Sequence, residues 1–285
     1  MEYCFKRKHT LIKTLFDSTD EQVINTTHTV NGWIRSTRKQ KDLVFLIMYD
    51  GSSADNLQIL PSDNISKETI NDIVVGTCVS ITGIIVKSPA KWQKFEMKAN
   101  EINIIGNVKD ISTYLPSTKK ISFDTLRLYQ HLRPKFRSFQ SIFRIRSKLM
   151  FIMQRFFEER GVFHLDPNII TTSDCEGAGE VFSITTLIND EHITNIPQIG
   201  CPTYGLMVDL IDFEKDFFKK HAYLTVSSQL QLEALCAGLG SVYTTNKSFR
   251  SEKSKTSRHQ AEFIHIEWEL AFINLKDLMD FSEDL

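Results

Sequence analysis

The residues best suited to chemistry lie in one charged stretch, FRSEKSKTSRHQAEF, which spans residues 249–263. It places four lysines and arginines, one histidine and two glutamates between two phenylalanines. Guanidinium groups bind phosphate and carboxylate oxygens through paired hydrogen bonds. The stretch therefore favours contact with an anionic ligand, although a charged run of this kind is also typical of an exposed hairpin.

Short β-rich runs separated by turns occupy residues 29–106 and predict a small barrel. A polar, helix-like insert at residues 61–74 interrupts them. Five strands in fewer than about 80 residues favour a nucleic-acid-binding barrel of the OB type, although other small barrels share this pattern. We predict an N-terminal extension at residues 1–28 and the barrel domain at residues 29–107.

A second, α+β domain is predicted at residues 126–285, after a polar linker at residues 108–125. Apolar residues recur at helical spacing between Phe139 and Arg160, which predicts one long amphipathic helix that ends at Gly161. Short strands are expected in AYLTVS, SVYTT and AEFIHIEWELAF (residues 222–227, 241–245 and 261–272). Since no regular crossover helices join these strands, we expect an antiparallel sheet.

The composition is that of a globular protein without a global attraction to nucleic acid. Hydrophobic residues make up 41% of the chain and the formal net charge is -1, so local clusters of Lys and Arg must bind any polyanion. The five cysteines lack the paired CxxC spacing of a zinc site, and we predict no metal-ligating residues. No apolar run approaches the roughly 18 residues of a membrane span, and the N-terminus lacks a signal-peptide core. A cytoplasmic location is expected, with an organellar address left open.

Four motifs taken together resemble the asparaginyl-tRNA synthetase family of class II aminoacyl-tRNA synthetases. They are the 249–263 stretch, which resembles motif 2 of that class, and the segments HLRP, TSDCEGAGEVF and LTVSSQLQLE (residues 131–134, 172–182 and 224–233). Several separate motifs in one order are far more specific than a single short motif. The resemblance covers most of the chain. It implies an OB-fold anticodon-binding domain followed by a class II catalytic domain on an antiparallel sheet.

The resemblance implies that Arg250 carries the chemistry of amino-acid activation. In that reaction a carboxylate attacks the α-phosphorus of ATP, and the two anions repel each other. A guanidinium that contacts both is most favourable as charge builds in the transition state. By the same resemblance, Glu252 accepts a hydrogen bond from the adenine amino group and Phe263 stacks on the ring. Arg258 and His259 contact the terminal phosphates, with Mg²⁺ as companion cation. The alternatives are a core role for Phe263 and a surface role for His259.

The amino-acid site implied by the resemblance contains Glu176, Ser228, Gln229 and Glu233. Ser227, Ser228 and Gln229 occupy the place where the family binds the substrate ammonium group, and Glu176 lies on a loop that closes over it. The related aspartate enzymes have a lysine at the position of Leu232, and that lysine pairs with the substrate's side-chain carboxylate. Leu232 and Glu233 therefore favour asparagine over aspartate. The alternative for Glu233 is a capping or solvent-facing role on its helix.

In the barrel domain, the resemblance assigns anticodon binding to Phe45, Gln58, Glu96 and Arg35. An exposed aromatic ring can stack on a base, a contact worth about 1 to 3 kcal/mol. A Phe45 side chain that points into the barrel is the alternative. The expected partners are tRNA(Asn), asparagine and a second copy of the chain, which would bind through motif 1 to form a homodimer.

Several positions depart from the family pattern. In LDPNII, Pro167 comes one position early and Asn168 takes the usual place of the motif 1 proline, which lies at the dimer interface in the family. Asn246 and Lys247 replace a Gly-Pro pair before motif 2, which predicts a looser hairpin, and Gln260 replaces an apolar residue.

The third motif of the class, a glycine-rich segment with an arginine against adenine, is absent from the 285 residues. We therefore expect a partial, C-terminally truncated catalytic domain. The predicted function is asparagine-tRNA ligation, with activity of this chain alone uncertain. The alternatives are aspartate-tRNA ligation and a non-catalytic tRNA-binding role.

Overall fold

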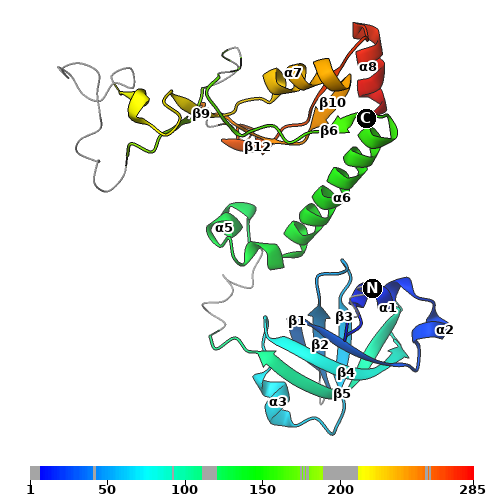
Figure 1. Ribbon diagram of the computed structural model, residues 1–285. Helices are drawn as coiled ribbons and strands as arrows, with labels where there is room; N and C mark the ends of the chain where they lie inside the picture. Colours follow the sequence, from blue (N-terminus) through cyan, green and yellow to red (C-terminus); the bar gives the residue numbers. More distant parts are fainter. Residues whose placement is uncertain are drawn as a thin grey trace, which may run out of the picture. The chain divides into compact units, whose positions relative to one another are not determined.

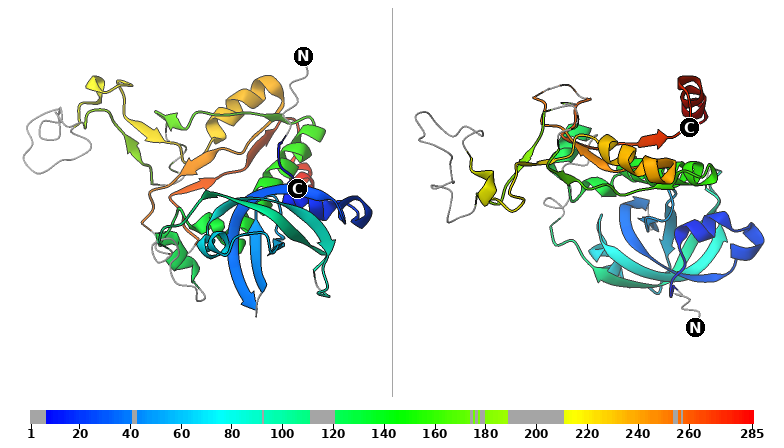
Figure 2. Two further views of the ribbon diagram at one scale, coloured as in Figure 1. Left: turned by 90° about the horizontal axis from the view of Figure 1, so that it is seen from below. Right: turned by 45° about the horizontal axis from the view of Figure 1, so that its top comes forward.

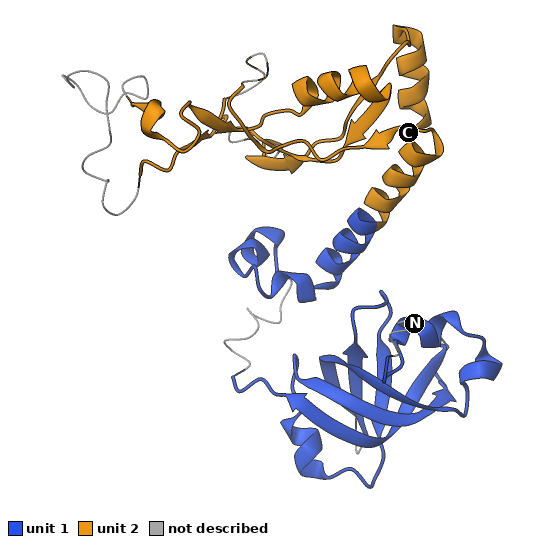
Figure 3. Ribbon diagram, in the orientation of Figure 1, with its two compact units in different colours: residues 1–147 blue, residues 148–285 orange. Residues whose placement is uncertain are grey.

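The computed structural model describes residues 7–40, 43–91, 93–110, 121–173, 175, 177, 180–188, 211–253, 256 and 258–285. The chain forms two compact units, residues 1–147 and 148–285. The boundary between them falls inside one long helix (Figure 3).

Unit 1 is built around a closed five-stranded barrel (Figure 1). The strand order is β1-β2-β3-β5-β4, and β3 runs parallel to β5 while the other neighbours are antiparallel. The elements before the shared helix are α1 (Ile12–Asp17), α2 (Asp20–Val23), β1 (Thr27–Gln40), β2 (Leu43–Tyr49), β3 (Leu57–Pro61), α3 (Lys67–Asp72), β4 (Cys78–Lys87), β5 (Phe95–Gly106), α5 (Phe123–Leu128) and the 3-10 turn η1 (Arg133–Lys135). The predicted OB barrel is confirmed, and α3 is the predicted insert. The middle of the predicted linker, residues 111–120, lies outside the described residues.

The barrel core includes two short helices that precede the first strand. Ile12 and Leu15 of α1 and Val23 of α2 are buried among the interior side chains of the barrel. The backbone N–H of Ile12 donates to the Asp50 carboxylate at 2.8 Å, so a side chain from the turn after β2 caps α1. Figure 2 shows both helices against the barrel. The segment from α1 to α2, within the predicted N-terminal extension, therefore contributes to the core of the barrel unit.

Helix α6 (Arg137–Glu159) confirms the predicted long helix, and Gly161 follows it at a φ of 69°. Of its predicted apolar face, only Met153 and Phe157 are buried. The apolar residues nearer its N-terminus are exposed, among them Leu149 at 52%. The helix therefore presents an apolar surface to solvent over much of its length.

Unit 2 holds two three-stranded sheets and a hairpin. The sheets have the orders β13-β10-β6 and β7-β9-β8, and β11 pairs with β12. The elements after α6 are β6 (Phe163–His164), β7 (Ile170–Thr171), β8 (Ser183–Ile184), the 3-10 turn η3 (Phe213–Lys215), β9 (Ala222–Leu224), α7 (Gln229–Leu239), β10 (Ser241–Thr244), β11 (Lys247–Phe249), β12 (Glu262–Ile264), β13 (Glu267–Leu270) and α8 (Leu275–Asp284).

The predicted antiparallel pairing predominates in unit 2, and one described pair of strands is parallel. Strand β10 pairs in parallel with β6, although its other neighbour, β13, is antiparallel. A parallel pair needs a long crossover, and the whole segment from β7 to α7 supplies it. The prediction missed this pair because the two strands are short and far apart in the sequence.

The second core lies where α6 meets β10 and β13. Phe157 is fully buried and its ring stacks on that of Tyr243, with centroids 4.0 Å apart. Trp268 of β13 and Phe281 of α8 complete the aromatic cluster. Helix α7 packs against β10 and β13 (Figures 1 and 2). This core fixes the start of β13 beside the start of α7.

Candidate functional site

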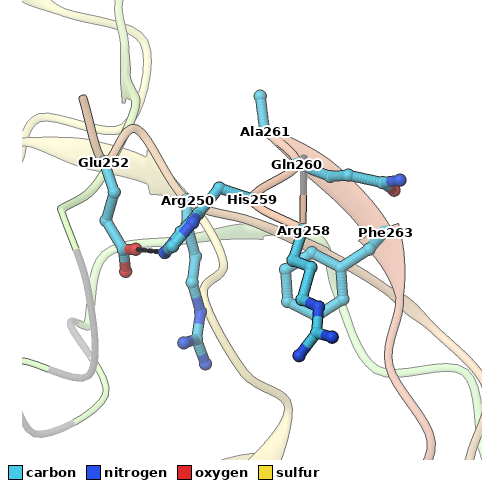
Figure 4. Close-up of a pocket in the computed structure, with 7 residues that line it drawn as sticks. All are labelled: Arg250, Glu252, Arg258, His259, Gln260, Ala261 and Phe263. Atoms are coloured by element: carbon cyan, nitrogen blue, oxygen red, sulfur yellow. Dashed lines mark ion pairs between the residues drawn. The ribbon is translucent and has the colours of Figure 1, made fainter. Parts of the chain in front are cut away.

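The hairpin of β11 and β12 carries a cavity of ≈ 500 Å³. Ser248 pairs with Phe263 across the hairpin, so the charged stretch forms its connecting loop. The lining side chains are Arg250, Glu252, Arg258, His259, Gln260, Ala261 and Phe263 (Figure 4). The structure thus brings together all five residues predicted to bind ATP.

Arg250 and Phe263 lie in contact on one side of this cavity. The guanidinium carbon of Arg250 is 5.7 Å from the centre of the Phe263 ring. Figure 4 shows the guanidinium groups of Arg250 and Arg258 extending to the same side. The Nε of Arg250 is buried and has no hydrogen-bond partner among the described residues. Because a buried donor without a partner costs about 1 to 3 kcal/mol, an anion bound here would relieve that cost.

Glu252 and His259 face each other across the same loop. The imidazole Nε2 lies 3.7 Å from a carboxylate oxygen of Glu252, a contact that is ionic only when the imidazole is protonated (Figure 4). The other ring nitrogen lies 2.5 Å from the Thr256 hydroxyl oxygen. The resemblance assigns these two residues to opposite ends of ATP, so nucleotide binding in that mode would separate them.

The base of the hairpin is held at the two places where the sequence departs from the family pattern. The Asn246 side-chain amide donates to the Pro167 carbonyl at 2.8 Å and accepts from its neighbour, the Lys247 N–H, at 2.8 Å. Lys247 Nζ also pairs with Glu262 at 2.5 Å across the hairpin. The Asn246 side chain thus ties the base of the hairpin to motif 1, and the expectation of a looser hairpin stays a prediction.

A second cavity, of ≈ 420 Å³, adjoins the hairpin. Its lining residues are Ser227, Gln229, Arg250, His265, Ile266, Glu267, Trp268, Glu269, Leu278 and Ser282. Arg250 lines both cavities. A guanidinium in that position could contact one ligand group from each.

The residues predicted to bind the amino acid are placed unevenly around the second cavity. Gln229 lines it and donates from its side-chain amide to Glu233 at 2.9 Å. Ser227 lines it in place of Ser228, whose side chain is fully buried beneath the start of α7. Leu232 is also fully buried, so any effect of Leu232 on substrate choice is indirect. Glu176 lies outside the described residues.

Two carboxylates of β13 that the sequence reasoning did not single out, Glu267 and Glu269, also line the second cavity. Burial raises the pKa of Glu269, and the nearby charges of Glu233 and Glu267 raise it further. The available signal was the sequence IEWEL, which places two acids two residues apart on one face of an otherwise apolar strand.

The segment before β9 is tied to the strand β8 region by a buried carboxylate. Asp216 accepts from the backbone N–H and hydroxyl of Thr186 at 2.9 and 2.6 Å, and from the Phe217 N–H at 2.7 Å. Burial alone would raise the pKa of Asp216, but hydrogen bonds from Thr185, Thr186 and Phe217 lower it to about 2.

We expect this carboxylate to make unit 2 less stable in acid. Because the folded-state pKa of Asp216 lies below its unfolded value, its contribution is complete above about pH 4 and is lost as the pH falls toward about 2. Asp216→Asn should lower the free energy of unfolding by about 1 to 2 kcal/mol at neutral pH and flatten its pH dependence below about pH 4. Urea titrations at several pH values measure both effects. An unchanged acid slope in the variant would contradict the assignment.

Three predicted anticodon residues lie on the outer face of the barrel. Leu46 and Met48 of β2 point into the core, so alternation places Phe45 outside, where it is half-buried. The Gln58 amide on β3 donates to the Glu96 carboxylate on β5 at 3.0 Å. Phe45 and Gln58 share a face because Ile47 pairs with Gln58. Their anticodon role stays a prediction.

The fourth predicted anticodon residue, Arg35, is already engaged within unit 1. Its guanidinium donates to Asn56 at 2.9 Å, to the Lys135 carbonyl at 3.2 Å and to Gln140 at 2.9 Å. It also lies over the Tyr49 ring, 4.1 Å from the centre. The anticodon role of Arg35 stays a prediction, and on this geometry it would require these bonds to be exchanged.

In the described part of the chain, no three His, Cys, Asp or Glu side chains are grouped so that they could hold a metal ion. None of the helices described is both long and apolar enough to cross a membrane.

Comparison with known families agrees with both units. Residues 28–105 match the OB-fold nucleic acid binding domain, and residues 123–285 match the tRNA synthetases of class II (D, K and N).

Similar proteins include two bacterial asparagine–tRNA ligases. That of Protochlamydia amoebophila is 41% identical over 279 residues, which cover 96% of this chain and 57% of the relative. That of Photobacterium profundum is 41% identical over 260 residues, or 90% of this chain and 53% of the relative. The chain thus spans about half the length of the curated relatives it matches.

A solved structure shares the fold. The asparaginyl-tRNA synthetase from Pyrococcus horikoshii, complexed with asparaginyl-adenylate, superposes with a TM-score of 0.77 at 22% identity. The match covers 98% of this chain and 56% of that one. Since the class II match alone extends over more than half of the sequence, the chain belongs to the class II tRNA synthetases of the D, K and N group.

Proposed function

We propose that this chain takes part in asparagine–tRNA ligation, in which ATP activates asparagine and the aminoacyl group is transferred to tRNA(Asn). The observation that carries the proposal is the place of Arg250, which lines both the hairpin cavity and the adjoining cavity of α7 and β13. About 40% identity to asparagine–tRNA ligases over nearly the whole chain supports the choice of reaction.

The first step joins two anions. A carboxylate oxygen of asparagine attacks the α-phosphorus of ATP, the bond from that phosphorus to the bridging β-oxygen breaks, and pyrophosphate leaves. Arg250 can donate to both reacting groups from its position between the cavities. The nucleophile is already ionised, so positioning and charge stabilisation supply the catalysis without a general base. In the second step, a hydroxyl at the tRNA 3′ end attacks the activated carbonyl and AMP leaves.

The surrounding residues would hold the nucleotide and select the amino acid. Glu252 and Phe263 would bind adenine, and Arg258 and His259 would bind the outer phosphates, as all four line the hairpin cavity. Mg²⁺ would enter the site bound to those phosphates, since it binds substrate phosphates readily and keeps much of its water shell.

Selection of asparagine would fall mainly to Glu233. A carboxylate there accepts from a side-chain amide and repels a side-chain carboxylate. Glu233 already accepts from the Gln229 amide, which is the same kind of donor that asparagine offers.

ATP–pyrophosphate exchange with asparagine and with aspartate, measured in parallel, tests the proposal. Exchange with asparagine alone is the expected result. Exchange with aspartate alone would replace the proposed substrate. Exchange with neither, under conditions where ATP still binds, would overturn the proposed activation step.

For the barrel unit, we expect Phe45→Ala to weaken tRNA(Asn) binding by about tenfold, because one aromatic–base stack contributes about 1 to 3 kcal/mol. Leu43 is 55% exposed on the same face of β2, so Leu43→Ala is a matched control that should leave affinity within about twofold. Filter binding or fluorescence anisotropy at fixed salt measures both. Equal losses in the two variants would contradict a stacking role.

A homodimer is part of the proposal. In unit 2, several apolar side chains of α6 and of the strand that follows it are exposed: Leu149, Phe151, Ile152 and Phe163. A second copy of the chain could bury this surface through motif 1. Sedimentation of the wild type and of Phe151→Glu measures the oligomeric state of each. A monomeric wild type at micromolar concentration would contradict the proposed homodimer.

A further inference from the structure

Glu267 is placed to control the first turn of α7, and no role in the proposed reaction has been given to it above. It begins β13, where it pairs with Thr244 of β10, and only 11% of its side chain is exposed. Its carboxylate reaches across to the residues that precede α7. The Ser228 backbone N–H lies 3.2 and 3.1 Å from the two carboxylate oxygens, and the Ser227 hydroxyl donates to one of them.

These bonds replace an ordinary helix cap. Ser228 stands at the N-cap of α7, but its own side chain makes no capping hydrogen bond, and its hydroxyl is buried without a partner among the described residues. Instead, the Ser227 hydroxyl oxygen accepts from the Gln229 N–H at 3.1 Å while its proton is directed to Glu267. The first free N–H groups of the helix are therefore satisfied by a relay that ends on a strand.

The electrostatics favour the same arrangement. A carboxylate near the N-terminus of a helix is stabilised by the partial positive charge of the free N–H groups. Its other close neighbour is His265, whose Nδ1 lies 3.4 Å from Glu267 and 3.1 Å from the Ser248 hydroxyl. Glu267 thus contacts the two residues that precede α7 and also His265, which lies between β12 and β13 and is itself bonded to Ser248 of β11.

The hydrogen bonds of Glu267 affect the site through the orientation of two side chains, Gln229 and Glu233. Gln229 is the first residue of α7 and Glu233 lies one turn later, and the two are joined by a hydrogen bond of 2.9 Å. The resemblance assigns both residues to the amino-acid site, and the proposed function gives Glu233 the selection of asparagine. A rotation of the first turn would move the Gln229 amide, which lines the cavity, together with its partner.

We propose that Glu267 is a positioning residue for asparagine, which sets the orientation of Gln229 through Ser227 and the Ser228 N–H. The inference rests on the proposed function, because it names asparagine as the ligand whose binding depends on this relay. Glu267 acts on the amino acid only, since it lines the second cavity and is absent from the lining of the hairpin cavity.

The test is calorimetric binding of asparagine, with a non-hydrolysable ATP analogue present, to wild type and Glu267→Gln. Glutamine keeps the size but removes the negative charge and replaces one carboxylate oxygen with an NH₂ group, which cannot accept a hydrogen bond from the Ser228 N–H. We expect asparagine affinity to fall by about tenfold, the usual scale for a hydrogen bond to a charged group. Affinity for the ATP analogue alone should stay within about twofold. Glu283→Gln, an exposed glutamate of α8, is the matched control and should change neither.

A double-mutant cycle separates positioning from a general loss of structure. In a Gln229→Ala background, Glu267→Gln should cost less than about twofold in asparagine affinity, because the group it orients is gone. Equal losses of asparagine and ATP affinity, or full additivity with Gln229→Ala, would overturn the inference. If Glu267→Gln fails to fold, Ser227→Ala breaks the same relay and should show the same selective loss.

The wild type distinguishes this inference from the proposed function. A wild type that binds asparagine, with a Glu267→Gln variant that binds it equally well, would overturn the positioning role alone. A wild type that binds ATP but not asparagine would overturn the proposed function and this inference with it.

Discussion

Arg250→Ala is expected to lower asparagine-dependent ATP–pyrophosphate exchange by about 10² to 10³-fold, the cost of removing one donor from a developing anionic centre. Arg250 lines both cavities, so under the proposed function its loss removes a contact to the nucleotide and a contact to the amino acid together. The free energy of unfolding should change little, because removing the buried Nε, which has no partner among the described residues, offsets the lost contact with the Phe263 ring.

Two further variants identify what the guanidinium supplies. Arg250→Lys keeps the charge but loses the planar fork that contacts two anions, so it should recover only a small part of the rate. Arg155→Gln removes an exposed guanidinium of α6 that pairs with Glu159, and exchange should stay within about twofold. An Arg250→Ala protein that exchanges at more than about a third of the wild-type rate would contradict the assignment of activation chemistry to this residue.

The sequence predicts the barrel unit well because its signals are local. Each strand has its own alternation of inward and outward side chains. The inward residues Leu46 and Met48, for example, alternate with outward neighbours, and this pattern does not depend on distant parts of the chain. The contribution of α1 could not be predicted in this way. A six-residue helix has too few positions for a clear period, and its burial depends on a cap from Asp50, 38 residues away.

The residues of the candidate site also differ in whether a local sequence signal identifies them. Arg250, Glu252 and Phe263 lie on one hairpin, so a continuous motif identifies them, and the structure brings them to one cavity. The roles of Ser227 and Glu267 depend on the meeting of α7 with β13, which lie 40 positions apart in the sequence. Residues within one continuous motif can thus be identified from the sequence pattern, whereas contacts between side chains of distant segments appear only in the tertiary structure.

Phe157→Ala is expected to lower the free energy of unfolding of unit 2 by about 3 to 5 kcal/mol, the usual cost of deleting a buried phenyl ring. Phe157 is fully buried, stacks on Tyr243 and contacts Trp268 and Phe281, so four elements lose packing at once. Because Trp268 follows Glu267 on β13, the loosened strand should also weaken asparagine binding. Hydrogen exchange read by mass spectrometry measures the loss in each unit separately.

Peptides from α6, β10 and β13 should lose protection in Phe157→Ala, while peptides from the barrel strands keep theirs, because the barrel has its own core. Phe217→Ala is the matched control, since Phe217 is 74% exposed and its truncation should cost less than about 0.5 kcal/mol. Protection that falls equally in both variants would show that ring size, and not burial against Tyr243, governs the loss. A fall that includes the barrel strands would show that the two cores unfold together, against their separation into two clusters.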